Sequence, residues 1–239
     1  MKTFRALSAL LQYPEPELIE AIDEIEAALD EEGMAPRVDL DALQWLIGEL
    51  RCGDIYDLQA DWVMHFDRTR ALSLHLFEHV HGESRDRGQA LVDLQSIYEA
   101  RGLAVETREL PDYLPLFLEY LSLLPLDEAR AMLGETAHVL AALAERLGKR
   151  RSAYEALFRT LLSIAAANPD AEALDALRDE PAPAPDDLEA LDAAWEEEAV
   201  TFGPGQSGCR DDLAAKIRQG RRPAPGVEEQ IRAARANMA

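Results

Sequence analysis

Residues 75–79 have the sequence HLFEH and contain the side chains best suited to metal chemistry. The H-x-x-E-H spacing is that of inverted zinc peptidases, in which two histidines bind the metal beside a glutamate. A helix over residues 68–81 would place His75 and His79, four residues apart, in one polar sector with Glu78. Zinc-dependent hydrolysis is therefore one hypothesis for this chain.

The rest of a catalytic zinc site is not marked in the sequence. Such a site needs a third protein ligand and an open position for water. Later glutamates such as Glu135 and Glu145 lie in ordinary amphipathic patterns, and His138 is an isolated candidate. The phosphate-binding motif G-x-x-x-x-G-K-[ST] and the G-x-S-x-G nucleophile motif are also absent from the sequence. We therefore predict no bound metal or cofactor, and the residues favour an interaction protein over an enzyme.

The residues after the histidines predict a turn between two antiparallel helices. Gly82 stands where a helix C-cap glycine belongs, and Ser84 is a suitable N-cap for the next helix. His79 and His81 would then lie in the last turn of the first helix, where exposed carbonyl groups favour donors and positive charge. This structural explanation of the same residues requires no metal.

Helical periodicity runs through most of the sequence and predicts an all-α fold. Apolar residues recur at the spacing of one helix face in successive segments, and no segment shows the sustained period-two alternation of a β-strand. Four of the expected helices cover residues 68–81, 84–102, 112–124 and 127–148. Asp112 is expected to cap the third of these helices, with Pro115 in its first turn.

The helical pattern stops near Asn168 and divides the chain into two parts. Residues 1–168 are predicted to form a single globular helical bundle domain. Residues 169–239 are predicted to form an acidic, proline-containing, mobile tail with short helices, which includes the Pro/Ala linker at 181–185. The sequence thus predicts one all-α domain followed by a tail.

The charge balance argues against several classes of partner. Lysine and arginine total 24 and aspartate and glutamate total 46 in 239 residues, so the formal net charge is −22. This charge repels nucleic-acid phosphates and anionic membranes, and we expect neither nucleic-acid binding nor stable membrane association. Cys52 and Cys209 make no disulfide framework. No stretch approaches the roughly 20 apolar residues of a membrane span, and we expect a cytoplasmic protein.

Three stretches of the sequence resemble the NarJ-type nitrate reductase assembly chaperones. They are LSALLQYPEPEL near the N-terminus, RTRALSLHLFEHVHGESRDRGQALVDLQSIYEARGL at residues 68–103 and ELPDYLPLFLEYLSLLP at residues 109–125. The later segment AAWEEEAVTFG is similar to the same family, so the resemblance spans nearly the whole chain. The family belongs to the wider TorD-like class of helical chaperones that mature molybdenum enzymes.

The resemblance implies an all-helical chaperone without catalytic activity. It implies binding to the N-terminal segment of the catalytic (alpha) subunit of the membrane-bound nitrate reductase. The apo-subunit would stay competent for molybdenum cofactor insertion before it docks at the membrane, and the chaperone would not remain in the finished enzyme. Proteins that deliver the cofactor are further partners that the resemblance allows.

The wider class carries a Glu-x-x-Asp-His-type motif before its later helices. The comparable stretch here is ELPDY, with Glu109, Asp112 and Tyr113. Tyrosine stands where the wider class has histidine, so no role of that imidazole is carried over to this chain.

Residues 113–124 carry more apolar side chains than a single core-facing stripe requires. Because an amphipathic client helix needs an apolar groove, this helix is a candidate for the groove surface. The expected client-binding residues are Leu114, Phe117, Tyr120, Leu121, His75 and His79. The alternative, a central helix buried on all sides, explains the same composition.

Overall fold

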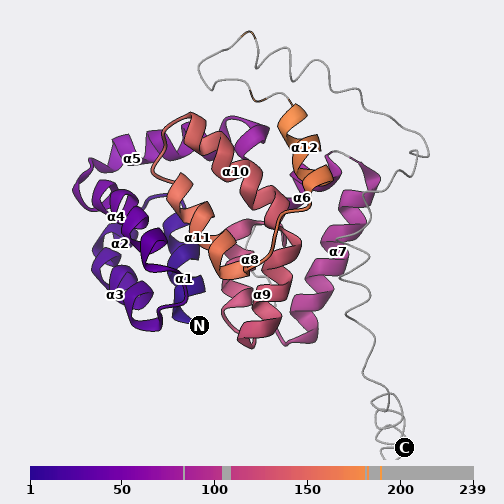
Figure 1. Ribbon diagram of the computed structural model, residues 1–239, viewed down its shortest axis with the longest axis horizontal. Coiled ribbons are helices and arrows are strands. Elements are labelled where there is room, and N and C mark those ends of the chain that lie inside the picture. Colours follow the sequence, from indigo (N-terminus) through magenta and orange to yellow (C-terminus); the bar gives the residue numbers. More distant parts are fainter. Residues whose placement is uncertain (83, 104–108, 181, 183–188, 190–239) are drawn as a thin grey trace, which may run out of the picture.

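The computed structural model describes residues 1–82, 84–103, 109–180, 182 and 189, and these form helices packed around one another (Figure 1). Within these residues there is no β-strand, and one isolated antiparallel bridge joins His75 and Tyr113. The all-α fold predicted from the sequence is confirmed. None of the helices in this described part has both the length and the apolarity needed to cross a membrane.

The elements, in chain order, are α1 (Lys2–Leu11), α2 (Pro16–Glu20), α3 (Ile22–Glu32), α4 (Arg37–Cys52), α5 (Ile55–Trp62), the π-helix η1 (Val63–Asp67), the 3-10 helix η2 (Arg70–Leu72), α6 (Leu76–His81), α7 (Arg85–Ala100), α8 (Leu114–Leu121), α9 (Leu126–Glu135), α10 (Ala137–Lys149), α11 (Glu155–Ala165) and α12 (Ala171–Asp179).

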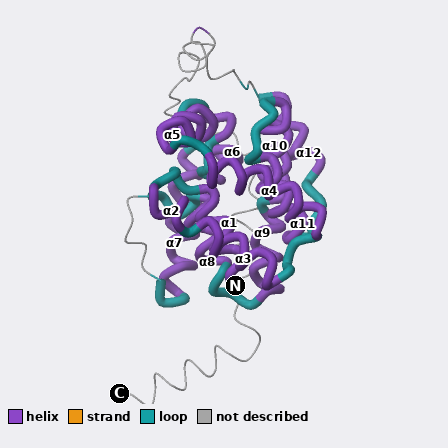
Figure 2. The backbone as a smooth tube through the Cα atoms, turned by 90° about the vertical axis from the view of Figure 1, so that its left-hand side faces the viewer, coloured by secondary structure: helices purple, strands orange, loops and turns teal. Residues whose placement is uncertain are grey.

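The helices α8 and α10 lie in the interior of the bundle, and their side chains are buried on most sides. α1 packs along α8, as the view in Figure 2 also shows, and α11 packs against both α10 and α4. In α10, Leu140, Leu143 and Leu147 have no exposed surface. Burial of each such side chain contributes roughly 1.5–3 kcal/mol. The buried apolar side chains form one continuous cluster that reaches from α1 to α12.

Several helix ends follow local sequence signals. Gly33 ends α3 in the left-handed conformation, with φ 57°, which glycine adopts without the steric cost that other residues pay. Asp54 caps α5, because its carboxylate accepts a hydrogen bond from the Tyr56 amide. Gly82 ends α6, and Ser84 is the N-cap residue of α7, although its hydroxyl makes no capping hydrogen bond. α6 therefore ends, and α7 begins, at the predicted residues.

Two of the expected helices are interrupted. The prediction of a single helix over residues 127–148 is wrong, because α9 ends and α10 begins around Thr136. The Thr136 hydroxyl donates a hydrogen bond to the carbonyl of Leu133, and such local bonds compete with a regular helix. The prediction of a helix over residues 68–81 is also wrong. Only the short η2 occurs in its first part, and regular α-helix begins at Leu76.

One further helix follows the expected end of the domain at residue 168. α12 packs against α10 and buries Leu174 and Leu177. Most of the tail expected over residues 169–239 lies outside the described residues, which after α12 include only Glu180, Ala182 and Glu189.

Candidate functional site

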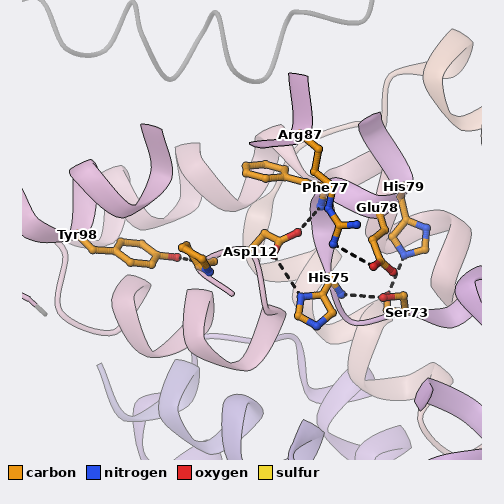
Figure 3. A network of polar contacts seen from close by, with 9 residues as sticks. Ser73, His75, Phe77, Glu78, His79, Arg87, Tyr98 and Asp112 are labelled. Atoms are coloured by element: carbon orange, nitrogen blue, oxygen red, sulfur yellow. Dashed lines mark hydrogen bonds and ion pairs between the residues drawn. The ribbon is translucent and has the colours of Figure 1, made fainter. Parts of the chain in front are cut away.

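Two segments far apart in sequence, residues 73–79 and 111–114, are held together by polar contacts, and we call them the clasp (Figure 3). Two backbone hydrogen bonds join them, from the Leu114 amide to the Leu74 carbonyl at 2.8 Å and from the Leu76 amide to the Asp112 carbonyl at 3.0 Å. These bonds fix the start of α6 beside the start of α8.

Asp112 caps α6 from the other segment of the clasp. Its side chain is fully buried, and its Oδ2 accepts a hydrogen bond from the Phe77 amide at 3.0 Å. Phe77 lies in the first turn of α6, where amide groups lack partners within the helix and the helix dipole favours an anion. The prediction that Asp112 caps a helix over 112–124 is therefore wrong, since α8 begins at Leu114 with Tyr113 as its N-cap residue.

His75 is the second partner of the Asp112 carboxylate. Its Nδ1 lies 3.2 Å from Oδ1 of Asp112, and because an ionised carboxylate only accepts, Nδ1 carries the proton. Desolvation lowers the pKa of His75, but the hydrogen bond and the charge of Asp112 outweigh it, so the pKa is raised. The side chain is 24% exposed, and its ring packs against that of Tyr113. His75 is therefore a protonatable group at the edge of the clasp.

His79 is buried and neutral at physiological pH. Its Nε2 lies 2.8 Å from the carbonyl oxygen of Ser73, so Nε2 is the protonated nitrogen of the neutral ring. Burial lowers the pKa of His79 to about 4, and the positive charge of Arg146 acts in the same direction. Arg146 itself donates from Nη1 to the carbonyl of Ala71 at 2.6 Å. These two side chains thus hold two carbonyl groups of the segment that leads into α6.

The three residues of the H-x-x-E-H spacing do not share a helix face. His75 has an extended backbone, with φ −88° and ψ 107°, and precedes the helix that carries Glu78 and His79. Glu78 forms an ion pair with Arg87 of α7 at 2.9 Å. The helical geometry behind the zinc hypothesis is therefore wrong. Among the residues that the structure describes, no group of three or more His, Cys, Asp or Glu side chains is arranged to hold a metal ion.

Tyr98 connects the clasp to α7 and α8. Its hydroxyl donates to the carbonyl of Pro111 at 2.8 Å, and its ring packs against that of Tyr120 with the centroids 4.6 Å apart. Burial raises the pKa of Tyr98 well above its usual value, and burial together with the charge of Glu109 raises the pKa of Tyr113 to about 12. Both phenols therefore stay neutral at physiological pH, and Tyr98 remains a hydrogen-bond donor.

The apolar residues expected to bind a client lie in the core. The four are at most 5% exposed: Leu114, Phe117, Tyr120 and Leu121. α1 and α9 pack against α8, which agrees with the alternative of a central, buried helix. Of the two histidines in the expected set, His79 is buried and His75 keeps a partly exposed side chain. Binding of a client by these six residues stays a prediction.

Sequence reasoning missed the residues that hold the clasp in place. Tyr98 and Arg146 lie in amphipathic patterns, and their partners, Pro111 and Ala71, are 13 and 75 residues away. One local signal was available, because Arg146 follows Leu143 by three residues and so lies on the apolar side of α10. A charged residue at such a position indicates a buried partner.

Comparisons with known proteins place the chain in a family. The family model described as nitrate reductase delta subunit matches residues 15–160. The Escherichia coli (strain K12) protein named nitrate reductase molybdenum cofactor assembly chaperone NarJ is 46% identical over 207 residues, 86% of each chain. The probable chaperone of the same kind named NarW, from the same strain, is 42% identical over 207 residues, 84% of each chain. The probable NarJ of Bacillus subtilis (strain 168) is 31% identical over 164 residues, 67% of this chain and 86% of the relative.

The fold is all-helical, and buried polar side chains such as Asp112 and Arg146 join segments that are far apart in sequence. Within that class, the chain belongs to the nitrate reductase delta subunit family, which here includes the NarJ-type assembly chaperones. The resemblance seen in residues 68–103 and 109–125 is confirmed.

Proposed function

We propose that this protein is a cytoplasmic chaperone that binds the N-terminal segment of the catalytic (alpha) subunit of nitrate reductase. Binding keeps the apo-subunit competent for molybdenum cofactor insertion and delays its docking at the membrane. The chaperone leaves before the enzyme is complete and catalyses no reaction of its own.

One observation carries this proposal: the 46% identity, over 86% of both chains, to a protein named nitrate reductase molybdenum cofactor assembly chaperone. The 42% identical relative is named for the same task. The net charge of −22 supports a client segment that carries basic residues, because opposite charges favour encounter.

A zinc-dependent hydrolase, the alternative raised by His75, Glu78 and His79, is not supported by the geometry. A zinc hydrolase needs imidazoles that converge on one point and a carboxylate that is free to act as base. Here the proton-bearing nitrogens of the two rings face Asp112 and Ser73, and Glu78 pairs with Arg87. These contacts join helices instead of assembling a metal site.

The proposed client is tested by affinity capture of the tagged chain from cells that express nitrate reductase, with the bound proteins identified by mass spectrometry. We expect the catalytic subunit to be recovered with the full chain. We expect a catalytic subunit without its N-terminal segment to be lost from the captured fraction. Recovery that does not depend on that segment would refute the proposed client site, and no recovery at all would refute the proposed client.

The proposed role is tested in a strain that lacks the gene for this protein. We expect nitrate reductase to be present but deficient in molybdenum cofactor, and both cofactor content and activity to return when the full chain is supplied. Normal cofactor content in the deletion strain would contradict an assembly role. Fractionation of the same cells should place the chaperone in the cytoplasmic fraction.

A further inference from the structure

The last described helix, α12, is attached to the bundle along one narrow edge. Leu174 and Leu177 are its two buried side chains, and the charged residues on its other sides are exposed. With nine residues, α12 is too short to be stable as an isolated helix in water. Its helical state therefore depends on docking to α10, beside which it lies in both overall views (Figures 1 and 2).

Two polar contacts fix the position of α12. The guanidinium of Arg178 spans the carboxylate of Glu145, with Nε 2.9 Å from Oε2 and Nη2 2.5 Å from Oε1. Such a two-pronged pair sets orientation as well as distance. The second contact runs from Nη2 of Arg146 to the carbonyl of Leu177, in the last turn of α12. Carbonyl groups of a last turn have no partner within their own helix, so Arg146 caps α12.

Arg146 is an unusual residue for a helix that faces the core. It is 7% exposed, and burial lowers the pKa of its guanidinium. A buried cation needs close polar partners to offset the loss of water. Its short contacts are the carbonyls of Ala71 and Leu177, while the carboxylate of Glu180 lies 3.9 Å away. The buried guanidinium of Arg146 therefore depends on a backbone carbonyl group that the docked helix supplies.

One turn before Glu145 and Arg146, the same side of α10 carries Ala141 and Ala142, both buried. Small side chains there allow a second helix to approach closely. These four residues, which we call the α12-binding face, combine a small apolar surface, one carboxylate and one buried arginine. Such a set recognises an amphipathic helix that has two apolar residues three apart, a basic residue next to the second, and free carbonyls at its end.

The connection before α12 carries backbone strain. Ala166 ends α11 with φ 52°, a left-handed conformation that costs an alanine free energy because of its Cβ atom. The Ala166 amide donates to the Leu162 carbonyl of α11, so this conformation belongs to the end of α11. The attachment of α12 itself rests on few buried side chains.

We propose that α12 is an internal occupant of a helix-binding site, and that a helical, basic N-terminal segment of the nitrate reductase catalytic subunit displaces it from the α12-binding face. This inference rests on the proposed function and assigns it a site. Charge complementarity supports this occupant, since Glu145 already pairs with an arginine and the chain is strongly acidic. The apolar face of α8, in contrast, is closed by α1 and α9.

Displacement of α12 would also affect the segment that leads into the clasp. The guanidinium of Arg146 holds Ala71 and Leu177 at the same time, and its charge helps to keep the pKa of His79 low. A bound helix that places its last carbonyl differently would change the support of the segment leading into α6.

The test uses a fluorescent peptide with the sequence of residues 170–180 and the full-length chain. In the Leu174→Ser, Leu177→Ser chain the internal helix is weakened and the α12-binding face is intact. We expect this chain to bind the peptide at least about 10-fold more tightly than the unmodified chain, because an attached competitor acts at an effective concentration in the millimolar range. Equal binding by the two chains, or none, would overturn the proposal.

A charge exchange provides the matched control. Adding Glu145→Arg to the Leu174→Ser, Leu177→Ser chain should abolish peptide binding, and a peptide with Arg178→Glu should restore it. If the double-serine chain does not melt cooperatively, Arg178→Glu in the full chain replaces it, because that change removes only exposed ion pairs, those of Arg178 with Glu145 and Asp175. Binding that is indifferent to the charge at residue 145 would show that the peptide binds elsewhere and would overturn the proposal.

The occupant is tested by competition. An unlabelled synthetic peptide covering the N-terminal segment of the catalytic subunit should displace the fluorescent peptide from the double-serine chain. If the client peptide binds the chain and leaves the probe in place, the inference is overturned and the proposed function stands. If the client peptide does not bind the chain at all, the proposed function fails, even when the probe shows that the α12-binding face accepts a helix.

Discussion

Asp112 serves two elements with one buried carboxylate. One oxygen caps α6 through the Phe77 amide, and the other faces the imidazole of His75. α6 has only six residues, so its stability comes from such tertiary contacts and not from its own length. Asp112 therefore stabilises a segment that lies 35 to 37 residues away from it along the chain.

We expect Asp112→Ala to lower the free energy of unfolding by about 2–4 kcal/mol, because it removes a cap and leaves a buried amide without a partner. Urea denaturation followed by circular dichroism measures this change. Asp54→Ala, which removes an exposed local cap from α5, is the matched control and should cost about 1 kcal/mol. If Asp112→Ala lowers the free energy of unfolding no more than Asp54→Ala does, the clasp does not make the expected contribution to the stability of the fold.

His79 should make the protein less stable as the pH falls. Its pKa is about 4 in the folded state and 6.5 is its ordinary value, so folding favours the neutral ring. The stabilisation is present above pH 6.5 and is lost as the pH falls from there toward 4. Between pH 7 and pH 5 the loss should be about 2 kcal/mol. The raised pKa of His75 acts in the opposite sense, because its contribution is present at low pH and is lost as the pH rises.

Comparison with His79→Gln isolates this effect. The contribution of His75 is common to both proteins, so the difference between their unfolding free energies at pH 7 and pH 5 reports His79. We expect the unmodified chain to lose about 2 kcal/mol more than the variant over this interval. Parallel pH profiles, or an NMR titration of His79 near pH 6.5, would show that the ring is not held neutral by burial.

At the scale of the element, α8 is the helix that the sequence suggested for client binding, and it is deeply buried. Six of its eight residues are buried, and the exposed apolar Leu123 lies just beyond its end. An apolar composition on all sides fits a helix that is surrounded by others. Its position between α1 and α9 accounts for that composition without a client.

The placement of α8 predicts how truncations of its aromatic residues behave. Phe117→Ala and Tyr120→Ala should each lower the free energy of unfolding by about 3–5 kcal/mol, because each leaves a cavity in the core. Leu123→Ala, at a position that is 59% exposed, should change it by no more than about 0.5 kcal/mol. Thermal melting of the three variants measures these effects.

The same variants test the client role that the sequence suggested for α8. Each is titrated with a peptide from the N-terminal segment of the catalytic subunit. A variant with near-normal melting and weakened binding would support direct client contacts on α8. Early melting of both aromatic variants would assign the helix to the core.

At the scale of the whole molecule, the position of α12 bears on where the folded domain ends. The sequence suggested an end near Asn168, but α12 continues the apolar cluster with Leu174 and Leu177. Its contacts with Glu145 and Arg146 add polar support from α10. We therefore expect the folded unit to extend to Glu180.

Two truncated chains test this expectation. A chain that ends after Glu180 should melt cooperatively at the temperature of the full-length protein. A chain that ends after Asn168 should still fold, but with a loss on the order of 2 kcal/mol and a Tm about 4–8 °C lower. Equal melting of the two would place the end of the domain at Asn168, and loss of most helical signal in the shorter chain would show that α12 is essential for folding.

The sequence by itself determined the helical class, many helix ends and the family. Periodic apolar residues, capping residues and glycines act within one or two turns, so a local pattern carries the information. For this reason the ends of α6 and α3 at Gly82 and Gly33 follow the residues. The family resemblance in residues 68–103 and 109–125 likewise needed no coordinates.

Only the tertiary structure decided what the polar residues do. A helical wheel placed His75 and His79 together, but pairing with residues 112–114 holds His75 in an extended conformation before α6 begins. The same pairing places the side chain of Asp112 at the start of α6, whereas the sequence suggested the start of α8. A capping aspartate looks the same in sequence whichever helix it serves, because the choice depends on which amide groups the folded chain brings near it.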